Sequence, residues 1–267
     1  MLTYPNIDPI AFSLGPLHVR WYGISYVVAI LTAWWLCSLR ARKSPSWSGD
    51  QVADLVFYST LGILIGGRLG EVLFYNLPYY LDNPLEVFMI NKGGMSFHGG
   101  LLGVIAAMLF FAKKYGKLFF TVSDFVAPVA PLGLFFGRIA NFINGELWGT
   151  PSMLPWAMVF PDPRAGGIPR HPSQLYEALL EGLLLFIILW WFTSKPRPLM
   201  AASGLFLLGY GVFRGLIEFV REPEPNNGYL AWDWLTMGQV LSLPMIILGV
   251  ILLVIAYVRG KVIQQMV

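Results

Sequence analysis

The chain has 267 residues, of which 56% are hydrophobic and only 12% are charged. A soluble domain carries roughly 25% charged residues, so this chain has about half the charge that a water-exposed surface requires. The composition, with a mean hydropathy of +0.62, excludes an ordinary soluble protein and indicates one that folds in lipid.

A bilayer core about 30 Å thick needs a helix of roughly 20 mostly apolar residues. Seven stretches of the sequence satisfy this requirement, so we predict an all-α integral membrane protein with seven transmembrane helices in a single domain, residues 1–267. In chain order, the approximate predicted spans are 18–39, 52–75, 95–112, 119–141, 173–193, 199–220 and 236–258. Residues 142–172, rich in Pro, Gly, Trp and Asn, are predicted to form a loop or head region outside the membrane.

Basic residues between the spans predict the orientation. Ten of the 18 Lys and Arg residues follow the first, third, fifth or seventh span. They are Arg40, Arg42, Lys43, Lys113, Lys114, Lys117, Lys195, Arg197, Arg259 and Lys261. By the positive-inside rule this side is cytoplasmic, which puts the N-terminus outside the cell membrane and the C-terminus in the cytoplasm. The net charge of +3 is then a signal of topology, and without a basic face or aromatic platform we expect no nucleic-acid partner.

Ionisable side chains within the spans need a reason, because each costs on the order of 3 kcal/mol at the bilayer centre. Arg214, Glu218 and Arg221 follow i, i+4, i+7 spacing, which predicts one helical face. Tyr210 precedes Arg214 by four residues and joins that face. The structural alternative to a functional site is an Arg214–Glu218 ion pair that makes burial tolerable.

The segment GRIANFINGELWG at 137–149 places Arg138 and Asn141 three residues apart, where the fourth predicted span ends. Its glycines allow close backbone approach and positive φ. Polar groups gathered at a helix end indicate a site for an anionic ligand at the membrane surface. A snorkelling arginine beside a capped helix end is the alternative.

Several other polar residues carry weaker signals. His98 lies among glycines at the start of the third span and is either structural or a proton-transfer group, since imidazoles change charge near neutral pH. Cys37 is the sole cysteine, which excludes an intramolecular disulfide, and we do not expect it to be a nucleophile. Arg68 and Glu71 stand three residues apart and are spaced for an ion pair. The scattered histidines give no basis for a metal site.

Two arginines on different helices match a phosphate group better than two lysines would, because the guanidinium can bind in bidentate fashion. A phosphate that belongs to a lipid would explain a site at headgroup depth. The rival hypothesis is an anion or lipid transporter whose arginines line its pathway. The sequence has no pair of interrupted spans in matching halves, the pattern that is typical of transporters.

Six motifs resemble those of bacterial prolipoprotein diacylglyceryl transferases. In chain order they are WYGISY at 21–26, GGRLGEVLFYN at 66–76, GGMSFHGGLLG at 93–103, GRIANFINGELWG at 137–149, RHPSQLYE at 170–177 and GYGVFRGLIEFVREP at 209–223. The resemblance extends over about residues 1–260, with seven spans in the orientation given above, although the 142–172 loop looks short for the family.

The resemblance implies an enzyme of the bacterial inner membrane with its active site towards the periplasm. Such an enzyme transfers the sn-1,2-diacylglyceryl group from phosphatidylglycerol to the lipobox cysteine thiol of a preprolipoprotein. A thioether forms and sn-glycerol 1-phosphate leaves, in the first step of lipoprotein maturation. The expected partners are phosphatidylglycerol, preprolipoprotein signal peptides and membrane lipids. No metal, nucleotide or other cofactor is implied, and nothing in the sequence demands more than a monomer.

The resemblance also implies roles for individual residues. His98, Arg138, Arg214 and Glu218 are expected to be catalytic, with His98 as the candidate base and the arginines as phosphate contacts. An arginine field that stabilises the thiolate is the alternative to a histidine base. The residues expected to bind the phosphatidylglycerol headgroup are Arg138, Asn141, Tyr210, Arg214, Arg221, Tyr22, Tyr26, Glu146 and Gly149. The weaker candidates are Asp124 and His171.

Overall fold

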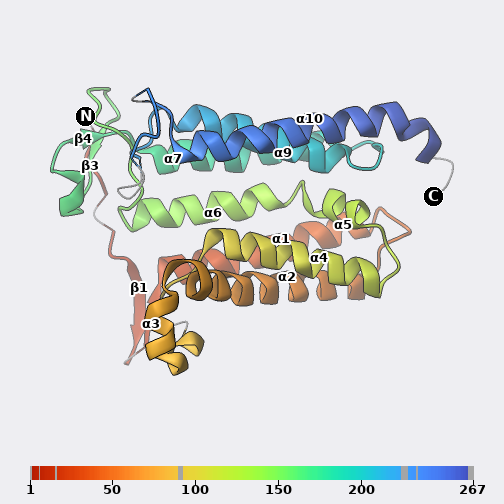
Figure 1. Ribbon diagram of the computed structural model, residues 1–267, viewed down its shortest axis with the longest axis horizontal. Helices are drawn as coiled ribbons and strands as arrows, with labels where there is room; N and C mark the ends of the chain where they lie inside the picture. Colours follow the sequence, from red (N-terminus) through yellow and green to blue (C-terminus); the bar gives the residue numbers. More distant parts are fainter. Residues whose placement is uncertain are drawn as a thin grey trace. The chain divides into compact units, whose positions relative to one another are not determined.

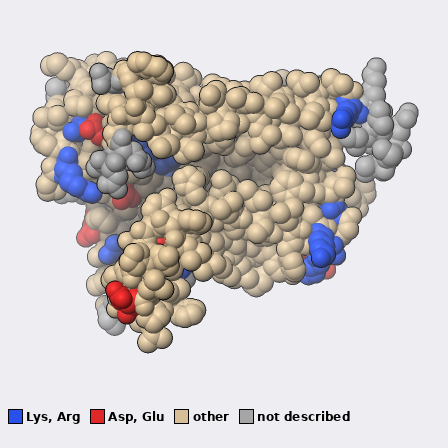
Figure 2. Space-filling view, viewed as in Figure 1, with Lys and Arg blue, Asp and Glu red and all other residues tan. Residues whose placement is uncertain are grey.

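The computed structural model describes residues 2–5, 7–15, 17–89, 93–223, 228–232 and 234–263. It is mostly helical and divides into two compact units. The large unit comprises Met1–Ala33 and Asp124–Val267, and the small unit comprises Trp34–Ser123. Five helices in the described residues are long and apolar enough to cross a membrane, or six if one bent pair counts as a span. Figure 2 shows the sides of the helices almost free of charged residues, which gather at the helix ends. These features identify a helical membrane protein.

The small unit is built around two closely packed helices. Its elements, in chain order, are the end of α1 (Trp21–Ala41), α2 (Gly49–Gly70), the π-helical η1 (Glu71–Tyr75), α3 (Leu77–Asp82), the 3₁₀ turn η2 (Pro84–Phe88), α4 (Phe97–Lys114) and the start of α5 (Phe119–Val126). A Cβ on Gly66 of α2 would lie 2.4 Å from the carbonyl oxygen of Gly99 on α4. Glycine at these positions therefore permits the close helix contact that small residues typically provide in membranes.

Arg68, near the end of α2, does not form the ion pair with Glu71 that the spacing suggested. Its guanidinium instead donates to backbone carbonyls of the segment that follows α3, including those of Val87 at 2.8 Å and Gly94 at 3.0 Å. Glu71 accepts a hydrogen bond of 2.6 Å from Nδ2 of Asn76. The expected pair is wrong because the chain folds back and offers Arg68 several carbonyl oxygens at once.

The large unit starts with a hairpin, β1 (Ile10–Leu14) and β2 (Leu17–Arg20), which leads into α1. Its other elements, in chain order, are the end of α5 (Phe119–Val126), α6 (Ala130–Ile143), β3 (Met158–Val159), η4 (Pro163–Ala165), β4 (Pro169–Arg170), α7 (Ser173–Glu177), the π-helical η5 (Ala178–Leu184), α8 (Leu185–Phe192), α9 (Ala201–Ile217) and α10 (Met237–Ile263). The two short antiparallel sheets, β1–β2 and β3–β4, were not predicted.

Two predicted spans differ from the helices found. The stretch predicted as the fourth span consists of α5 and α6, which are bent by 48° at a short break. Pro128 lies in the break and Pro131 in the first turn of α6, and proline lacks the N–H that would continue the helical hydrogen bonds. The sixth predicted span, 199–220, is represented by the 17-residue α9, which ends at Ile217.

The packing of the large unit brings the ends of four helices together. The segment α7–η5–α8 packs on α6 and α9, and α9 runs along α10. Figure 1 shows the end of α6 and the starts of α7 and α10 close to the short strands β3 and β4. Side chains from the end of α6, the start of α7, the end of α9 and the start of α10 can therefore meet there.

Candidate functional site

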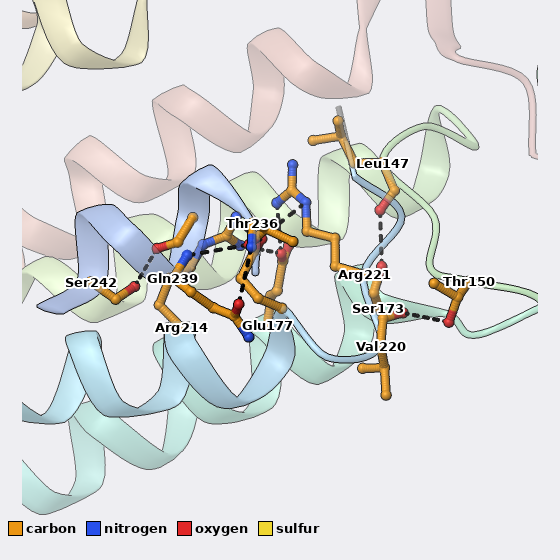
Figure 3. Close-up of polar contacts among 12 residues, drawn as sticks. Leu147, Thr150, Ser173, Glu177, Arg214, Val220, Arg221, Thr236, Gln239 and Ser242 are labelled. Carbon is orange, nitrogen blue, oxygen red and sulfur yellow. Dashed lines mark hydrogen bonds and ion pairs between the residues drawn. The ribbon is translucent and has the colours of Figure 1, made fainter. Parts of the chain in front are cut away.

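Glu177 is the centre of a buried ionic cluster. Its side chain is completely buried, and its Oε1 lies 2.6 Å from Nη1 of Arg214 and 2.8 Å from Nη1 of Arg221. Its Oε2 lies 2.9 Å from Nε of Arg138. Figure 3 shows Arg214 and Arg221 converging on Glu177. One carboxylate on α7 thus binds three guanidinium groups that come from α6, α9 and the turn after α9.

Two further carboxylates complete the cluster. Glu181, one turn after Glu177, is also fully buried and lies 3.6 Å from Arg138 and 3.7 Å from Arg214. Among the residues that the structure describes, neither Glu181 oxygen accepts a hydrogen bond. Glu218 forms an ion pair with Arg214, which confirms the pairing predicted from their spacing.

We call these six residues, Arg138, Arg214, Arg221, Glu177, Glu181 and Glu218, the arginine–glutamate cluster. Its formal charges balance, three against three, as burial requires. The arginine side chains keep 17%, 15% and 9% of their surface exposed, whereas two of the glutamates keep none. The glutamates therefore form the base of the cluster, and an approaching anion would meet the arginines first.

Arg221 reaches the cluster through a turn and not along the helix. Because α9 ends at Ile217, Arg221 does not share a helical face with Arg214. Residues 218–220 form a turn instead, and Arg221 makes an isolated antiparallel bridge with Gly149. The prediction that Arg221 shares a helical face with Arg214 is therefore wrong, although the turn brings both arginines to the carboxylate of Glu177.

Gly149 lies where three backbone segments meet. Its N–H donates to the carbonyl of His171 at 2.8 Å, and the N–H of Thr150 donates to the carbonyl of Val220 at 3.0 Å. A Cβ on Gly149 would lie 2.3 Å from the Val220 oxygen and 2.7 Å from Cβ of His171. Any larger residue would push apart the strand-like contact that holds Arg221.

The loop before Gly149 is fixed by two fully buried residues at the start of α7. Nε2 of Gln174 donates to the carbonyl of Glu146 at 2.6 Å, and Oγ of Ser173 donates to the carbonyl of Leu147 at 3.0 Å. Leu147 has a positive φ of 61°, an unusual conformation for a residue with a branched side chain. These bonds tie the loop to the helix that carries Glu177.

A second polar group follows the cluster along α6. Nδ2 of Asn141, one turn after Arg138, donates to Oε1 of Glu146 at 2.8 Å. The Tyr22 hydroxyl interacts with the side chains of Asn141 and Tyr26, and the two tyrosine rings lie 5.4 Å apart. The start of α1 thus contributes hydroxyl groups beside the amide and carboxylate that follow Arg138.

Tyr210 lies on α9 one turn before Arg214. It is 9% exposed, packs with Leu185 and Leu189, and lies within electrostatic reach of Glu181. Its ring therefore closes the apolar side of the cluster.

The family model for prolipoprotein diacylglyceryl transferase matches residues 9–255. The chain belongs to this family. It is 57% identical over 260 residues to the phosphatidylglycerol–prolipoprotein diacylglyceryl transferase of Pseudomonas paraeruginosa, with 97% of each chain covered. It is 59% identical over 261 residues to the protein of the same name from Methylococcus capsulatus, covering 97% of this chain and 99% of the relative. The match confirms the resemblance found in the motifs.

Other residues predicted for a diacylglyceryl transferase site belong to other elements. His98 lies in the small unit, exposed in the first turn of α4, and its ring packs against that of Phe97 with centroids 5.7 Å apart. Asp124 accepts hydrogen bonds from the N–H groups of Met200 and Ser203 at the start of α9, the helix end opposite Arg214. Asp124 is therefore a helix cap rather than a member of the site.

His171 lies between β4 and α7. Its Nδ1 lies 3.2 Å from the hydroxyl of Tyr176, which accepts a hydrogen bond of 2.7 Å from Nε1 of Trp156. Burial lowers the pKa of His171 below its usual value, so the neutral ring is favoured. Its backbone, which bonds to Gly149 and Thr150, is its connection to the site.

Glu177 and Glu181 were not among the residues predicted for the site. Two signals could have found them. Glu177 ends the RHPSQLYE motif, and it stands four residues before Glu181 in an otherwise apolar span. Two intramembrane carboxylates on one helical face require cationic partners, and Arg138 and Arg214 were the available ones.

Proposed function

We propose that this chain transfers the sn-1,2-diacylglyceryl group of phosphatidylglycerol to the lipobox cysteine of a preprolipoprotein, the first step of bacterial lipoprotein maturation. The observation that carries the proposal is the convergence of three arginines on Glu177 at one end of the bundle, in a member of the prolipoprotein diacylglyceryl transferase family. The relatives are named for phosphatidylglycerol and prolipoprotein, and a lipid phosphate is the anion that the arginines suit.

In the proposed reaction, the cysteine sulfur attacks the glyceryl carbon that carries the phosphate ester. A carbon–sulfur bond forms, the carbon–oxygen bond breaks, and the bonding electrons leave on the oxygen of sn-glycerol 1-phosphate. The thiol proton passes to a base. Negative charge thus grows on the departing phosphate, and donors that are already oriented stabilise it without reorganisation. Glu177 supplies that orientation, because it holds Arg138 and Arg214 before the lipid arrives.

The remaining site residues fit the headgroup. Arg138 and Arg214 are our candidates for direct phosphate contact, with Arg221 beside them. Asn141 and Glu146, with the hydroxyls of Tyr22 and Tyr26, offer the donors and acceptors that the glycerol hydroxyls of phosphatidylglycerol require. Those expected to shape the site are Gly149, Glu218 and Tyr210.

We further propose seven spans, a periplasmic N-terminus and a monomeric enzyme of the inner membrane whose cluster faces the periplasm. Arg197, after α8, and Arg259, near the end of α10, lie at the bundle end opposite the cluster. Their position is consistent with the positive-inside rule. Labelling of single cysteines by an impermeant reagent in intact cells tests this orientation: residues in 142–172 should react, and residues beside Arg259 should not.

A thiol with a pKa near 8.5 is mostly protonated at neutral pH, so transfer needs a base or a positive field. If His98 is the base, His98→Gln should slow transfer at pH 7 by 10² to 10⁴-fold, the usual contribution of such a group. Part of this loss should be recovered at pH 9, where the substrate thiol ionises without help. The measurement is the pH–rate profile with a lipobox peptide. A profile of unchanged shape would assign thiolate stabilisation to the arginine field instead.

Cys37→Ser should leave transfer within about twofold of the unchanged enzyme, because the reacting thiol belongs to the substrate. Cys37 is 3% exposed in the part of α1 that belongs to the small unit. The initial rate of peptide modification checks this expectation. A folded but inactive Cys37→Ser protein would place the nucleophile in this chain.

The deciding experiment measures transfer from glycerol-labelled phosphatidylglycerol to a lipobox peptide, with Arg138→Ala beside the unchanged protein. The peptide should gain the mass of one diacylglyceryl unit, with one glycerol phosphate released for each, and the variant should lose both. If no transfer occurs while the reconstituted protein moves lipid or anions across a bilayer, the transporter hypothesis replaces the proposal.

A further inference from the structure

The Glu218 carboxylate is held by the residue that precedes α10. Oγ1 of Thr236 donates to Oε2 of Glu218 at 2.5 Å, and the two residues are 2% and 6% exposed. The other oxygen of Glu218 pairs with Arg214 and lies 3.8 Å from Nε of Arg221. Figure 3 shows Thr236 and Gln239, at the start of α10, beside Arg214. Glu218 therefore connects α10 to two arginines of the arginine–glutamate cluster.

The first turn of α10 also leaves space for this carboxylate. A Cβ on Gly238 would lie 2.3 Å from Cδ of Glu218 and 2.5 Å and 2.6 Å from its two oxygens. An added Cβ would therefore push the carboxylate away from the positions in which it bonds to Thr236 and Arg214. The first turn of a helix has N–H groups without helical partners and favours nearby negative charge. The carboxylate thus packs directly on backbone that suits an anion.

Thr236 also caps α10, and a test of its bond to Glu218 must leave this cap intact. Its Oγ1 accepts from the N–H of Gln239 at 3.2 Å, and its own N–H donates to Oε1 of Gln239 at 3.0 Å. These two bonds form a capping box at the start of α10. A hydroxyl has one donor and two acceptor sites, so it can cap the helix and hold Glu218 at the same time.

We propose that Thr236 and Gly238 are positioning residues, which set the orientation of Arg214 and Arg221 through Glu218. The inference rests on the proposed function, because the arginines are then the groups that meet the lipid phosphate. Neither residue touches the substrate in this scheme. Their effect is on the rate of transfer rather than on folding.

The first test compares Thr236→Ser with Thr236→Gly in the full-length protein. Serine is a good helix cap and glycine caps a helix nearly as well as threonine, but only serine can also donate to Glu218. Thr236→Ser should keep kcat within about threefold. Thr236→Gly should nearly keep the melting temperature in detergent but lower kcat at least tenfold, with a smaller change in KM for phosphatidylglycerol. If Thr236 only caps α10, the two variants will have equal kcat, and the inference is overturned.

The second test is Gly238→Ala, with Gly215→Ala as its matched control. A Cβ on Gly215 would meet only Cβ of Ser242, at 4.0 Å, so this variant should behave as the unchanged protein. Gly238→Ala should lose at least tenfold in kcat, and a normal kcat overturns its assignment. If Gly238→Ala does not fold, the two Thr236 variants decide. An unchanged protein that transfers nothing defeats the proposed function itself, whereas an active one with equal Thr236 variants defeats only this inference.

Discussion

Glu177→Gln is expected to lower the transfer rate by at least 100-fold and to lower the melting temperature as well. The glutamine keeps the shape of the side chain but removes the charge that Arg138, Arg214 and Arg221 share. Removing one partner from a buried ion pair costs about 3–5 kcal/mol, because the remaining charge has no counter-ion. Here three guanidinium groups lose their common partner, so we expect them to separate and no longer present a single phosphate site.

The measurement is the initial rate of peptide lipidation together with thermal unfolding in detergent. The matched control is Asp162→Asn, which removes an ion pair of 2.7 Å to Arg164, whose side chain is 77% exposed. Exposed pairs contribute about 0–1 kcal/mol, so this variant should keep its rate within about twofold. A Glu177→Gln protein that turns over within threefold of the unchanged enzyme would show that the arginines do not need Glu177 for their orientation.

Much of the architecture could be predicted because the membrane leaves few alternatives. Long apolar runs gave the positions of the main helices, with α4 over Phe97–Lys114 close to the predicted 95–112. Arg138 and Arg214 were visible as candidates for the same reason, since a charge in an apolar span is costly and must have a partner or a function. The Arg214–Glu218 pair followed from helical spacing alone.

Contacts between distant segments could not be predicted in the same way. The spacing of Arg221 suggested a helical face, but the chain turns after Ile217 and pairs with Gly149 instead. Glu177 lies 39 residues after Arg138 and 37 before Arg214 in the sequence, and only the packing of α7 between α6 and α9 shows that it binds both. The contact of Thr236 was equally unpredictable, because its hydroxyl donates to Glu218, which lies 18 residues earlier in the sequence.

The sequence also could not show which groups each charged side chain would bind. Arg68 and Glu71 had the spacing of a pair, yet Arg68 binds carbonyls of residues 86–94. Sequence spacing shows which side chains can meet on one helix. It does not show that a loop folding back onto the helix offers backbone carbonyls as competing hydrogen-bond acceptors. The family motifs covered part of this gap for the site, since they marked Arg138, Arg214 and Gly149 without reference to their geometry.

Arg138→Lys is expected to lose at least 100-fold in transfer rate while remaining folded. Arg138 reaches Glu177 through Nε at 2.9 Å and Glu181 through Nη2 at 3.6 Å, and its planar fork can do this while still presenting a donor to phosphate. A lysine keeps the positive charge, and with it much of the stability, but its single nitrogen cannot serve two carboxylates and a bidentate phosphate together.

The comparison is made by kcat and KM for phosphatidylglycerol, with Arg259→Lys, at the opposite end of α10 from the cluster, as the control expected to keep its rate. Loss of kcat together with a normal melting temperature would assign the effect to the transition state rather than to folding. Near-normal turnover in Arg138→Lys would mean that charge alone is sufficient. The bidentate contact would then have to be assigned to Arg214 or Arg221, which the corresponding lysine variants would decide.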